Sequence, residues 1–213
     1  MKLNVTKLPT SVYVKEIEPS KFKTMICDCG KRDFKGAPNY FNLGFFAEDV
    51  SKKTITIGNI VGEGTVYSDA SLTADWINLA KKSLTTIYTT TSGACGIIKT
   101  RSIKRVPRCK NAVSGIPIIR NGSKVSMATI TKEGYFGNEV YKNWHGFLGI
   151  RNNKLVYVAA DCDFDQMYPL MAALGIDNAI KLDGGGSFIL EENNKLLQAT
   201  SGNRRINSVG VWE

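Results

Sequence analysis

The sequence predicts an α+β fold, with one domain over residues 1–213, a mixed, largely antiparallel β-sheet core and few helices. Segments rich in β-branched and aromatic residues dominate the chain, and they do not alternate regularly with helical segments as a parallel sheet would require. Two asparagine-containing turns join neighbouring segments into expected hairpins. The length of 213 residues, with 43% hydrophobic and 22% charged residues, suits one sizeable core.

Short strands are expected through the first half of the chain. Residues 12–17 alternate between apolar and polar side chains, and residues 22–27 are the expected partner strand. The segment 54–60 is β-branched. Gly44 lies inside the aromatic segment 39–46, which indicates a bulge or a close approach of backbone at that point.

Hairpins and further strands are expected in the second half. Residues 115–130 turn at Asn121-Gly122, the strongest short hairpin signal in the chain, and residues 145–160 turn at Asn152-Asn153. Strands are expected on both sides of a glycine-rich loop and at the end of the chain, over residues 178–182, 187–190, 195–200 and 206–212.

Two helices are expected. One spans residues 71–82, where apolar side chains share one face. The other begins at Asp163, which forms a capping box with Gln166, and ends at Gly175. Pro169 falls inside it, so its first turns are expected to be distorted.

The chain is basic, with a net charge of +9 and a pI of about 9.3, so its surface attracts anions such as nucleic acid, anionic polymers or phosphorylated small molecules. A basic surface without a specific anion is the alternative. The N-terminus has no apolar signal region, and no segment is long enough to span a membrane. We therefore expect a cytoplasmic protein, or part of a larger assembly, with no membrane partner.

The five cysteines are expected to be free thiols, because the chain lacks a secretion signal. Cys27 and Cys29 form a C-x-C pair without the second pair that structural zinc needs. Asp161, Asp163 and Asp165 alternate but lack the spacing of a calcium loop. No metal and no cofactor are therefore expected.

Residues 99–110 hold six basic side chains in twelve positions. They form either a solvated loop or a surface that attracts a polyanionic substrate. Nucleic acid is not expected as a partner, because no aromatic residues that could stack on bases are interleaved with the basic ones.

The loop Asp183-Gly184-Gly185-Gly186-Ser187 follows an apolar segment. A hairpin turn is one interpretation, but one glycine would supply the positive φ that such a turn needs. Three glycines cost backbone entropy, roughly 1 kcal/mol each relative to alanine. Such a cost is accepted where a ligand approaches the backbone, whose N–H groups can then form an anion-binding nest. Asp183 could accept hydrogen bonds from sugar hydroxyls or act as a catalytic carboxylate.

The stretch LGIDNAIKLDGGGSFIL, residues 174–190, resembles the hallmark of the phosphodiester glycosidase family. Four further segments are similar to family motifs and follow in the same order, so the resemblance covers nearly the whole chain. They are NLGFF from Asn42, GIPIIRNGSKV from Gly115, HGFLGIRNNKLVYVAA from His145 and RRINSVGVW from Arg204. The family has an arginine where this chain has His145, its only histidine.

The resemblance implies a hydrolase that cleaves the glycosidic bond of a sugar-1-phosphodiester and releases free sugar and a phosphomonoester. Its partner would be a small or polymeric sugar-phosphate substrate. Asp183 would stabilise positive charge at the anomeric carbon. His145 would act as a cation or proton donor, since histidine titrates near neutral pH, although it lacks the bidentate fork of arginine. The implied substrate-binding residues are Asn42, Gly184, Gly185, Gly186, Ser187 and Arg205.

Each site residue also has a purely structural interpretation. His145 could be a core histidine, Asn42 a turn residue, and Arg204 and Arg205 a solvated pair on the last strand. A second carboxylate is not fixed by the sequence, and Glu48 and Asp161 are guesses for it. The alternative function is a binding module that has lost catalysis and sequesters a sugar-phosphate or nucleotide-type ligand.

Overall fold

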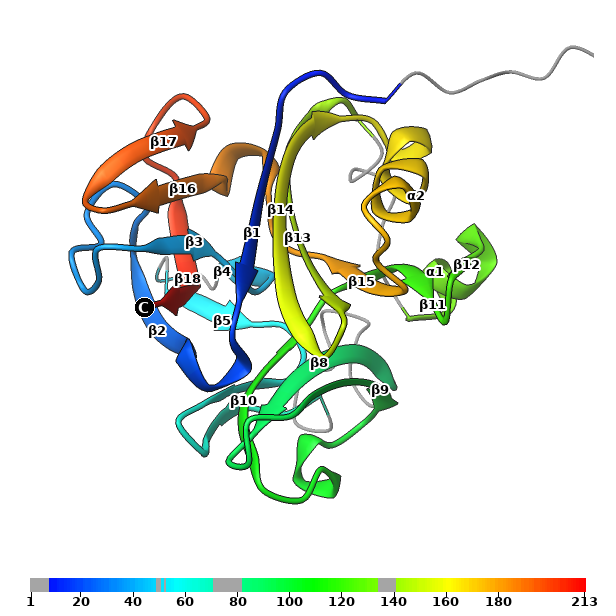
Figure 1. Cartoon of the computed structure of the whole chain (residues 1–213). Helices are drawn as coiled ribbons and strands as arrows, with labels where there is room; N and C mark the ends of the chain where they lie inside the picture. Colours follow the sequence, from blue (N-terminus) through cyan, green and yellow to red (C-terminus); the bar gives the residue numbers. More distant parts are fainter. Residues whose placement is uncertain (1–7, 49–50, 52, 71–81, 134–140) are drawn as a thin grey trace, which may run out of the picture.

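The computed structural model describes residues 8–48, 51, 53–70, 82–133 and 141–213 (Figure 1). The predicted α+β class is confirmed, because this part of the chain is mostly strand and contains two α-helices. The helices are α1 (Met127–Glu133) and α2 (Phe164–Ala173), with short 3-10 turns η1 (Pro19–Lys21), η3 (Ile103–Arg105) and η5 (Gly185–Ser187). The strands are β1 (Val12–Ile17), β2 (Phe22–Gly30), β3 (Tyr40–Asn42), β4 (Phe46–Glu48), β5 (Thr54–Thr56), β6 (Ile60–Gly62), β7 (Thr65–Ser68), β8 (Leu84–Thr90), β9 (Cys95–Thr100), β10 (Cys109–Ser114), β11 (Ile116–Arg120), β12 (Ser123–Lys124), β13 (Asn143–Arg151), β14 (Lys154–Cys162), β15 (Asn178–Lys181), β16 (Ile189–Glu192), β17 (Lys195–Ala199) and β18 (Arg205–Trp212).

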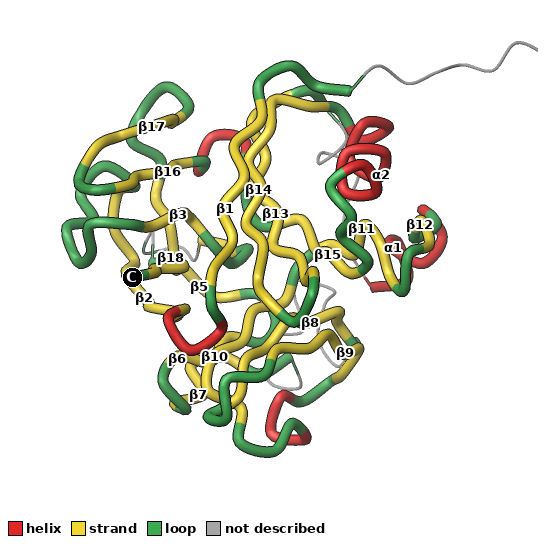
Figure 2. The backbone as a smooth tube through the Cα atoms, viewed as in Figure 1, coloured by secondary structure: helices red, strands yellow, loops and turns green. Residues whose placement is uncertain are grey.

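The strands, drawn yellow in Figure 2, form three main sheets. Every pairing between described strands is antiparallel. The central sheet has the order β1-β14-β13-β15-β11-β12. A second sheet, β7-β6-β10-β8-β9, lies at one end of the molecule, and a third, β17-β16-β3-β18-β2, lies beside the central one (Figure 1). Strands β4 and β5 form a separate pair.

Aromatic side chains join the central sheet to the third sheet. The ring of Phe41 on β3 stacks on Tyr157 of β14, with centroids 3.8 Å apart and planes 9° from parallel. Leu182 and Phe188 belong to the same buried cluster and lie on either side of the glycine-rich loop. Two anchored apolar side chains therefore hold both ends of this loop in the core.

Most of the local turn and helix signals are confirmed, but residues 127–130, expected in the second strand of a hairpin, begin helix α1. Strands β13 and β14 form a hairpin that turns at Asn152 and Asn153, and the β11–β12 hairpin turns at Asn121-Gly122. Helix α2 carries the capping box of Asp163 and Gln166, contains Pro169, and is followed by Gly175 at φ +66°. The helix expected over 71–82 lies outside the described residues except for its last position.

The expected pairing of residues 12–17 with residues 22–27 is wrong. Strand β1 pairs with β14 of the central sheet, whereas β2 pairs with β18 of the third sheet. The 3-10 turn η1 separates the two strands and begins at Pro19, which has no N–H to donate to a ladder. The turn therefore carries the chain from one sheet to the other instead of folding it back on itself.

Candidate functional site

The glycine-rich loop is a crossing between two sheets rather than a hairpin turn. Strand β15, before the loop, belongs to the central sheet, and β16, after it, belongs to the third sheet. The backbone N–H of Asp183 donates to the carbonyl of Leu43 at 3.1 Å, and the N–H of Leu182 donates to Gly146 at 2.8 Å. Asp183 therefore stands where the central sheet ends, at the junction with the third sheet.

Asn42 fixes the backbone of this loop. Its side-chain Nδ2 donates to the carbonyl of Asp183 at 2.7 Å, and its Oδ1 accepts from the N–H of Ile189 at 3.2 Å. Asn42 is buried at the end of β3, so one amide side chain connects both ends of the loop to the third sheet. These contacts orient the backbone at Asp183.

Each of the three glycines has a neighbour or a backbone angle that accounts for it. A Cβ at Gly184 would lie 3.2 Å from the carbonyl oxygen of Trp144 and 3.3 Å from Nδ1 of His145. Gly185 has φ +56°, in the left-handed region that favours glycine. A Cβ at Gly186 would lie 3.1 Å from Cδ of Arg204. The surrounding protein therefore favours glycine at all three positions, and a bound ligand would add to this preference.

His145 lies directly against the glycine loop. It sits on β13 with 3% of its surface exposed, and its Nε2 is 3.1 Å from the carbonyl oxygen of Tyr141. A carbonyl only accepts, so Nε2 carries the proton and donates it to that bond. The Nδ1 side of the ring faces Gly184. The structure thus places His145 against Gly184, the residue that follows Asp183. These are the two positions predicted to be catalytic, His145 itself and the loop that carries Asp183.

The two neighbouring arginines at the start of β18 differ in their surroundings. The Arg205 guanidinium donates to the Asp28 carboxylate at 2.9 Å and to its backbone carbonyl at 2.5 Å. The hydrogen bond to Asp28 raises the pKa of Arg205. Burial acts to raise the pKa of Asp28, but hydrogen bonds from Thr54 and Arg205 outweigh it and lower that pKa.

Arg204, not Arg205, is the arginine that lies on the loop. Its side chain covers Gly186, and its guanidinium carbon is 6.0 Å from the ring centroid of Phe46. Arg204 is exposed, so its guanidinium can reach an incoming anion, whereas Arg205 is bound to Asp28. At the loop, Arg204 therefore presents an exposed guanidinium, whereas the guanidinium of Arg205, the residue that the resemblance implies, is paired with Asp28.

Lys31 is a site residue that the sequence did not reveal. Its side chain is fully buried, and Nζ donates to the Gly186 carbonyl at 2.5 Å, to Thr200 Oγ1 at 2.8 Å and to the Ser201 carbonyl at 3.4 Å. Thr200 Oγ1 in turn donates to the Gly185 carbonyl at 2.8 Å. Burial, together with the charges of nearby arginines, lowers the pKa of Lys31. In the sequence Lys31 stands in a polar, glycine-containing segment typical of an exposed loop, which is why no signal pointed to it.

Two further side chains near the loop, the predicted Ser187 and the unpredicted Lys181, hydrogen-bond to backbone carbonyls. Ser187 is buried, and its hydroxyl donates to the carbonyl of Arg205 at 3.3 Å. Lys181, also fully buried, donates to the Leu182 carbonyl at 3.1 Å and lies 5.1 Å from the ring centroid of Phe45. Two buried lysines therefore bind carbonyls at the loop: Lys31 binds that of Gly186, and Lys181 binds that of Leu182, directly before the loop.

The two residues guessed as a second carboxylate lie in different places. Glu48 is exposed at the end of β4. Asp161 lies on β14 opposite Trp144, the neighbour of His145, and its carboxylate is 3.8 Å from Nζ of Lys142. Asp161 is thus the nearer of the two to the His145 strand in the sheet register.

Within the described ranges, no cluster of three or more His, Cys, Asp or Glu side chains is arranged to hold a metal ion. None of the helices in the described part of the chain has the length and apolar character needed to cross a membrane.

Comparison with known proteins identifies relatives for almost the whole chain. The family model described as phosphodiester glycosidase matches residues 39–211. No curated protein sequence matches. Among solved structures, the auto-inhibited catalytic domain of zebrafish N-acetylglucosamine-1-phosphodiester alpha-N-acetylglucosaminidase is similar, with a TM-score of 0.70 and 13% identity over 99% of this chain and 85% of that one. A hypothetical protein from Synechocystis has a TM-score of 0.64 and 14% identity over 94% of this chain and 58% of its own.

Proposed function

Because the chain belongs to the phosphodiester glycosidase family, we propose that it hydrolyses the glycosidic bond of a sugar-1-phosphodiester and releases free sugar and a phosphomonoester. The observation that carries this proposal is the position of Asp183. Its backbone is fixed by Asn42 and Leu43 at the end of a buried strand, and the loop that follows packs against His145. A carboxylate carried on a backbone fixed in this way is suited to stabilise charge at one point.

In this mechanism the bond from the anomeric carbon to the bridging oxygen breaks, and its electron pair leaves with the phosphate. Water adds its oxygen to the anomeric carbon and gives up one proton, which passes to solvent, so that the products are the free sugar and the phosphomonoester dianion. Phosphate is a good leaving group, so the main requirement is to stabilise the oxocarbenium-like transition state, and Asp183 supplies the negative charge for it. The exposed guanidinium of Arg204 and the amides of the glycine loop bind the phosphate.

His145 assists the leaving phosphate in this proposal. Its Nε2 proton is directed to the Tyr141 carbonyl, so the imidazole is held in one orientation with Nδ1 toward the loop. Protonation at Nδ1 would turn the ring into a cation beside the phosphate site. A single histidine makes a weaker anion site than the arginine of the family pattern, and Arg204 compensates for the missing guanidinium.

The replacement Asp183→Asn tests the assignment. We expect sugar release from sugar-1-phosphate methyl diesters to fall by about 100-fold or more, since the charge is lost while the shape is kept. Asp177→Asn is the matched control, because Asp177 is an exposed carboxylate in the turn before the same strand. Both variants should keep the melting temperature of the wild type.

Two outcomes would overturn the proposal. Undiminished sugar release by the folded Asp183→Asn variant would remove Asp183 from the chemistry. Stoichiometric binding of the diester by the wild type, measured by calorimetry, with no free sugar formed over hours, would instead identify a binding module.

A further inference from the structure

The positive charge of this protein is concentrated in one continuous stretch. Residues 82–133 contain ten of the 28 Lys and Arg residues but only one of the 19 Asp and Glu residues, so the stretch has a net charge of +9. The net charge of the whole chain is also +9, and the remaining residues therefore sum to zero. The stretch is coloured green in Figure 1 and forms β8 to β12, η3 and α1, at one end and along one side of the molecule.

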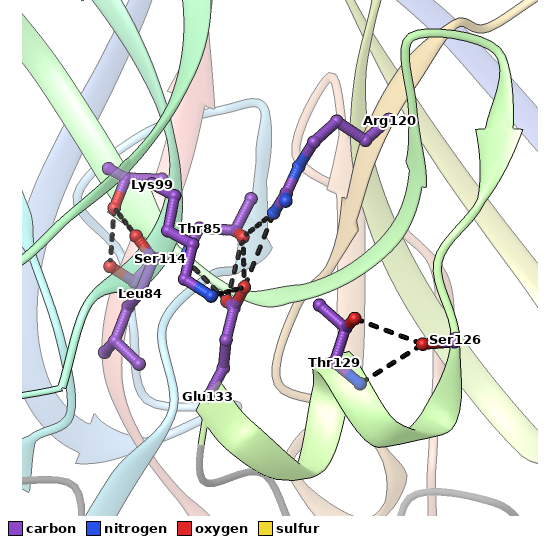
Figure 3. Close-up of polar contacts among 9 residues, drawn as sticks. Leu84, Thr85, Lys99, Ser114, Arg120, Ser126, Thr129 and Glu133 are labelled. Atoms are coloured by element: carbon purple, nitrogen blue, oxygen red, sulfur yellow. Dashed lines mark hydrogen bonds and ion pairs between the residues drawn. The ribbon is translucent and has the colours of Figure 1, made fainter.

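The single acidic residue of the stretch is already neutralised. Glu133 is fully buried at the end of α1, where its carboxylate accepts from the backbone and hydroxyl of Thr85 and pairs with Lys99 at 3.2 Å and Arg120 at 3.4 Å (Figure 3). It therefore leaves no negative charge on the surface. From outside the stretch, Glu63 contributes one ion pair, to Lys110 at 3.7 Å.

Of the seven cations of the stretch that remain, Lys82 is partly buried and the others are exposed. Six of them make no ion pair with any described residue: Arg101, Lys104, Arg105, Arg108, Lys124 and Lys132. We call the four that surround η3, namely Arg101, Lys104, Arg105 and Arg108, the basic face. Unpaired, same-sign charges repel one another, so this arrangement is destabilising unless a bound anion relieves it. The only aromatic residue in the stretch is Tyr88, so the basic face offers charge without a platform for stacking bases.

The stretch is connected to the candidate site through the strand order. Lys99 lies opposite Thr85 in the β8–β9 pair, and the carbonyl of Thr85 accepts from the N–H of Gly115. The next residue, Ile116, lies opposite Lys181, two positions before Asp183. Hydrogen-bonded strands thus lead from β9, which directly precedes the basic face, to β15, which directly precedes the glycine loop.

From these observations we infer that the substrate is a polymer, a glycan chain joined by phosphodiesters, whose phosphates bind the basic face while one glycosyl phosphodiester occupies the glycine loop. This inference rests on the proposed function. Phosphates repeating along a flexible chain complement several unpaired cations at once, and each contact releases a counterion. A single sugar diester has one phosphate and would leave the basic face empty.

The test uses a fluorescently labelled oligomer of α-1-phosphate-linked N-acetylglucosamine and the full chain. In the triple variant Arg101→Gln, Lys104→Gln, Arg105→Gln, we expect weaker oligomer binding and a salt slope of log Kobs that is smaller by about 2, near the loss for three phosphate contacts of a single strand. The control is Lys21→Gln, Lys35→Gln, Lys195→Gln, which removes the same charge from exposed positions elsewhere and should leave the slope unchanged.

The readouts separate this inference from the proposed function. Release of sugar from a single methyl diester should be equal in the wild type and both triple variants, because that substrate does not reach the basic face. Suppose that the wild type releases sugar from the single diester, but the two triple variants bind the oligomer with the same affinity and the same salt slope as each other. The inference is then wrong and the proposed function stands. If a DNA duplex binds through the basic face and the oligomer does not, the surface belongs to nucleic acid and the inference is equally overturned.

Discussion

At the scale of single residues, the site depends on buried polar side chains that hold backbone rather than substrate. Asn42, Lys31 and Thr200 together bind the carbonyls of Asp183, Gly185 and Gly186. A carbonyl that is bound from behind fixes its peptide plane, which sets the direction of the neighbouring N–H groups. The loop is therefore preorganised, as an electrostatic site requires.

Lys31 offers a direct test of this preorganisation. Lys31→Met removes the ammonium donors to the Gly186 carbonyl, Thr200 and the Ser201 carbonyl, and leaves the Gly186 carbonyl with the Thr200 hydroxyl at 3.1 Å as its remaining side-chain donor. We expect a loss of about 2 kcal/mol in the free energy of unfolding, measured with urea, because a hydrogen bond from a charged group contributes about 1.5–3 kcal/mol. Sugar release should fall mainly through kcat, since the loop loses its fixed geometry.

The neighbouring Arg32 provides the control. It is exposed, and Arg32→Met removes a positive charge from the same segment without touching the loop carbonyls. This variant should retain the stability and the kcat of the wild type. Equal kcat values in Lys31→Met and Arg32→Met would contradict a positioning role for Lys31.

At the scale of elements, the sequence predicted what local chemistry determines and missed what depends on distant partners. The capping box of Asp163, the Asn121-Gly122 turn and the strands on both sides of Asp183 rest on neighbours in the chain, and all are present. The partner of β1 could not be predicted, because strands β1 and β14 are separated by most of the chain and their pairing depends on tertiary packing.

The candidate site shows the same division. The acid and the glycines were visible as a motif. The contacts of Lys31, the pairing of Arg205 with Asp28 and the position of Arg204 beside Gly186 were not. A buried lysine has no distinctive sequence pattern when its acceptors are carbonyls, since every residue carries one. Which of two adjacent arginines faces the loop depends on the register of β18 with β2.

Helix α1 packs into the core through Ile130 and is tied to β8 and β9 by the buried Glu133, which gives a prediction at this scale. Glu133→Gln keeps the shape but weakens the contacts with Lys99 and Arg120, two cations that are each about one-third exposed. Solvent screening reduces the cost below that of a fully buried pair, so we expect a loss of about 1–2 kcal/mol in urea unfolding. Lys132→Gln, at the exposed neighbouring position, should change stability by less than about 0.5 kcal/mol, and an equal loss in both variants would contradict this role for Glu133.

At the scale of the whole molecule, charge and catalytic motif occupy different parts of one fold. The glycine loop joins the central sheet to the third sheet, whereas the excess positive charge lies on the stretch from β8 to α1. The family match covers both parts. This division fits an enzyme in which one surface attracts a polyanion and a separate loop acts on a single bond.

The most direct test of the central claim is the identity of the bond that breaks. Hydrolysis of a sugar-1-phosphate methyl diester in ¹⁸O-labelled water can be followed by mass spectrometry of both products. A glycosidase adds water at the anomeric carbon, so the account predicts ¹⁸O in the released sugar and none in the methyl phosphate. Label in the phosphate, with none in the sugar, would identify a phosphodiesterase and contradict the account.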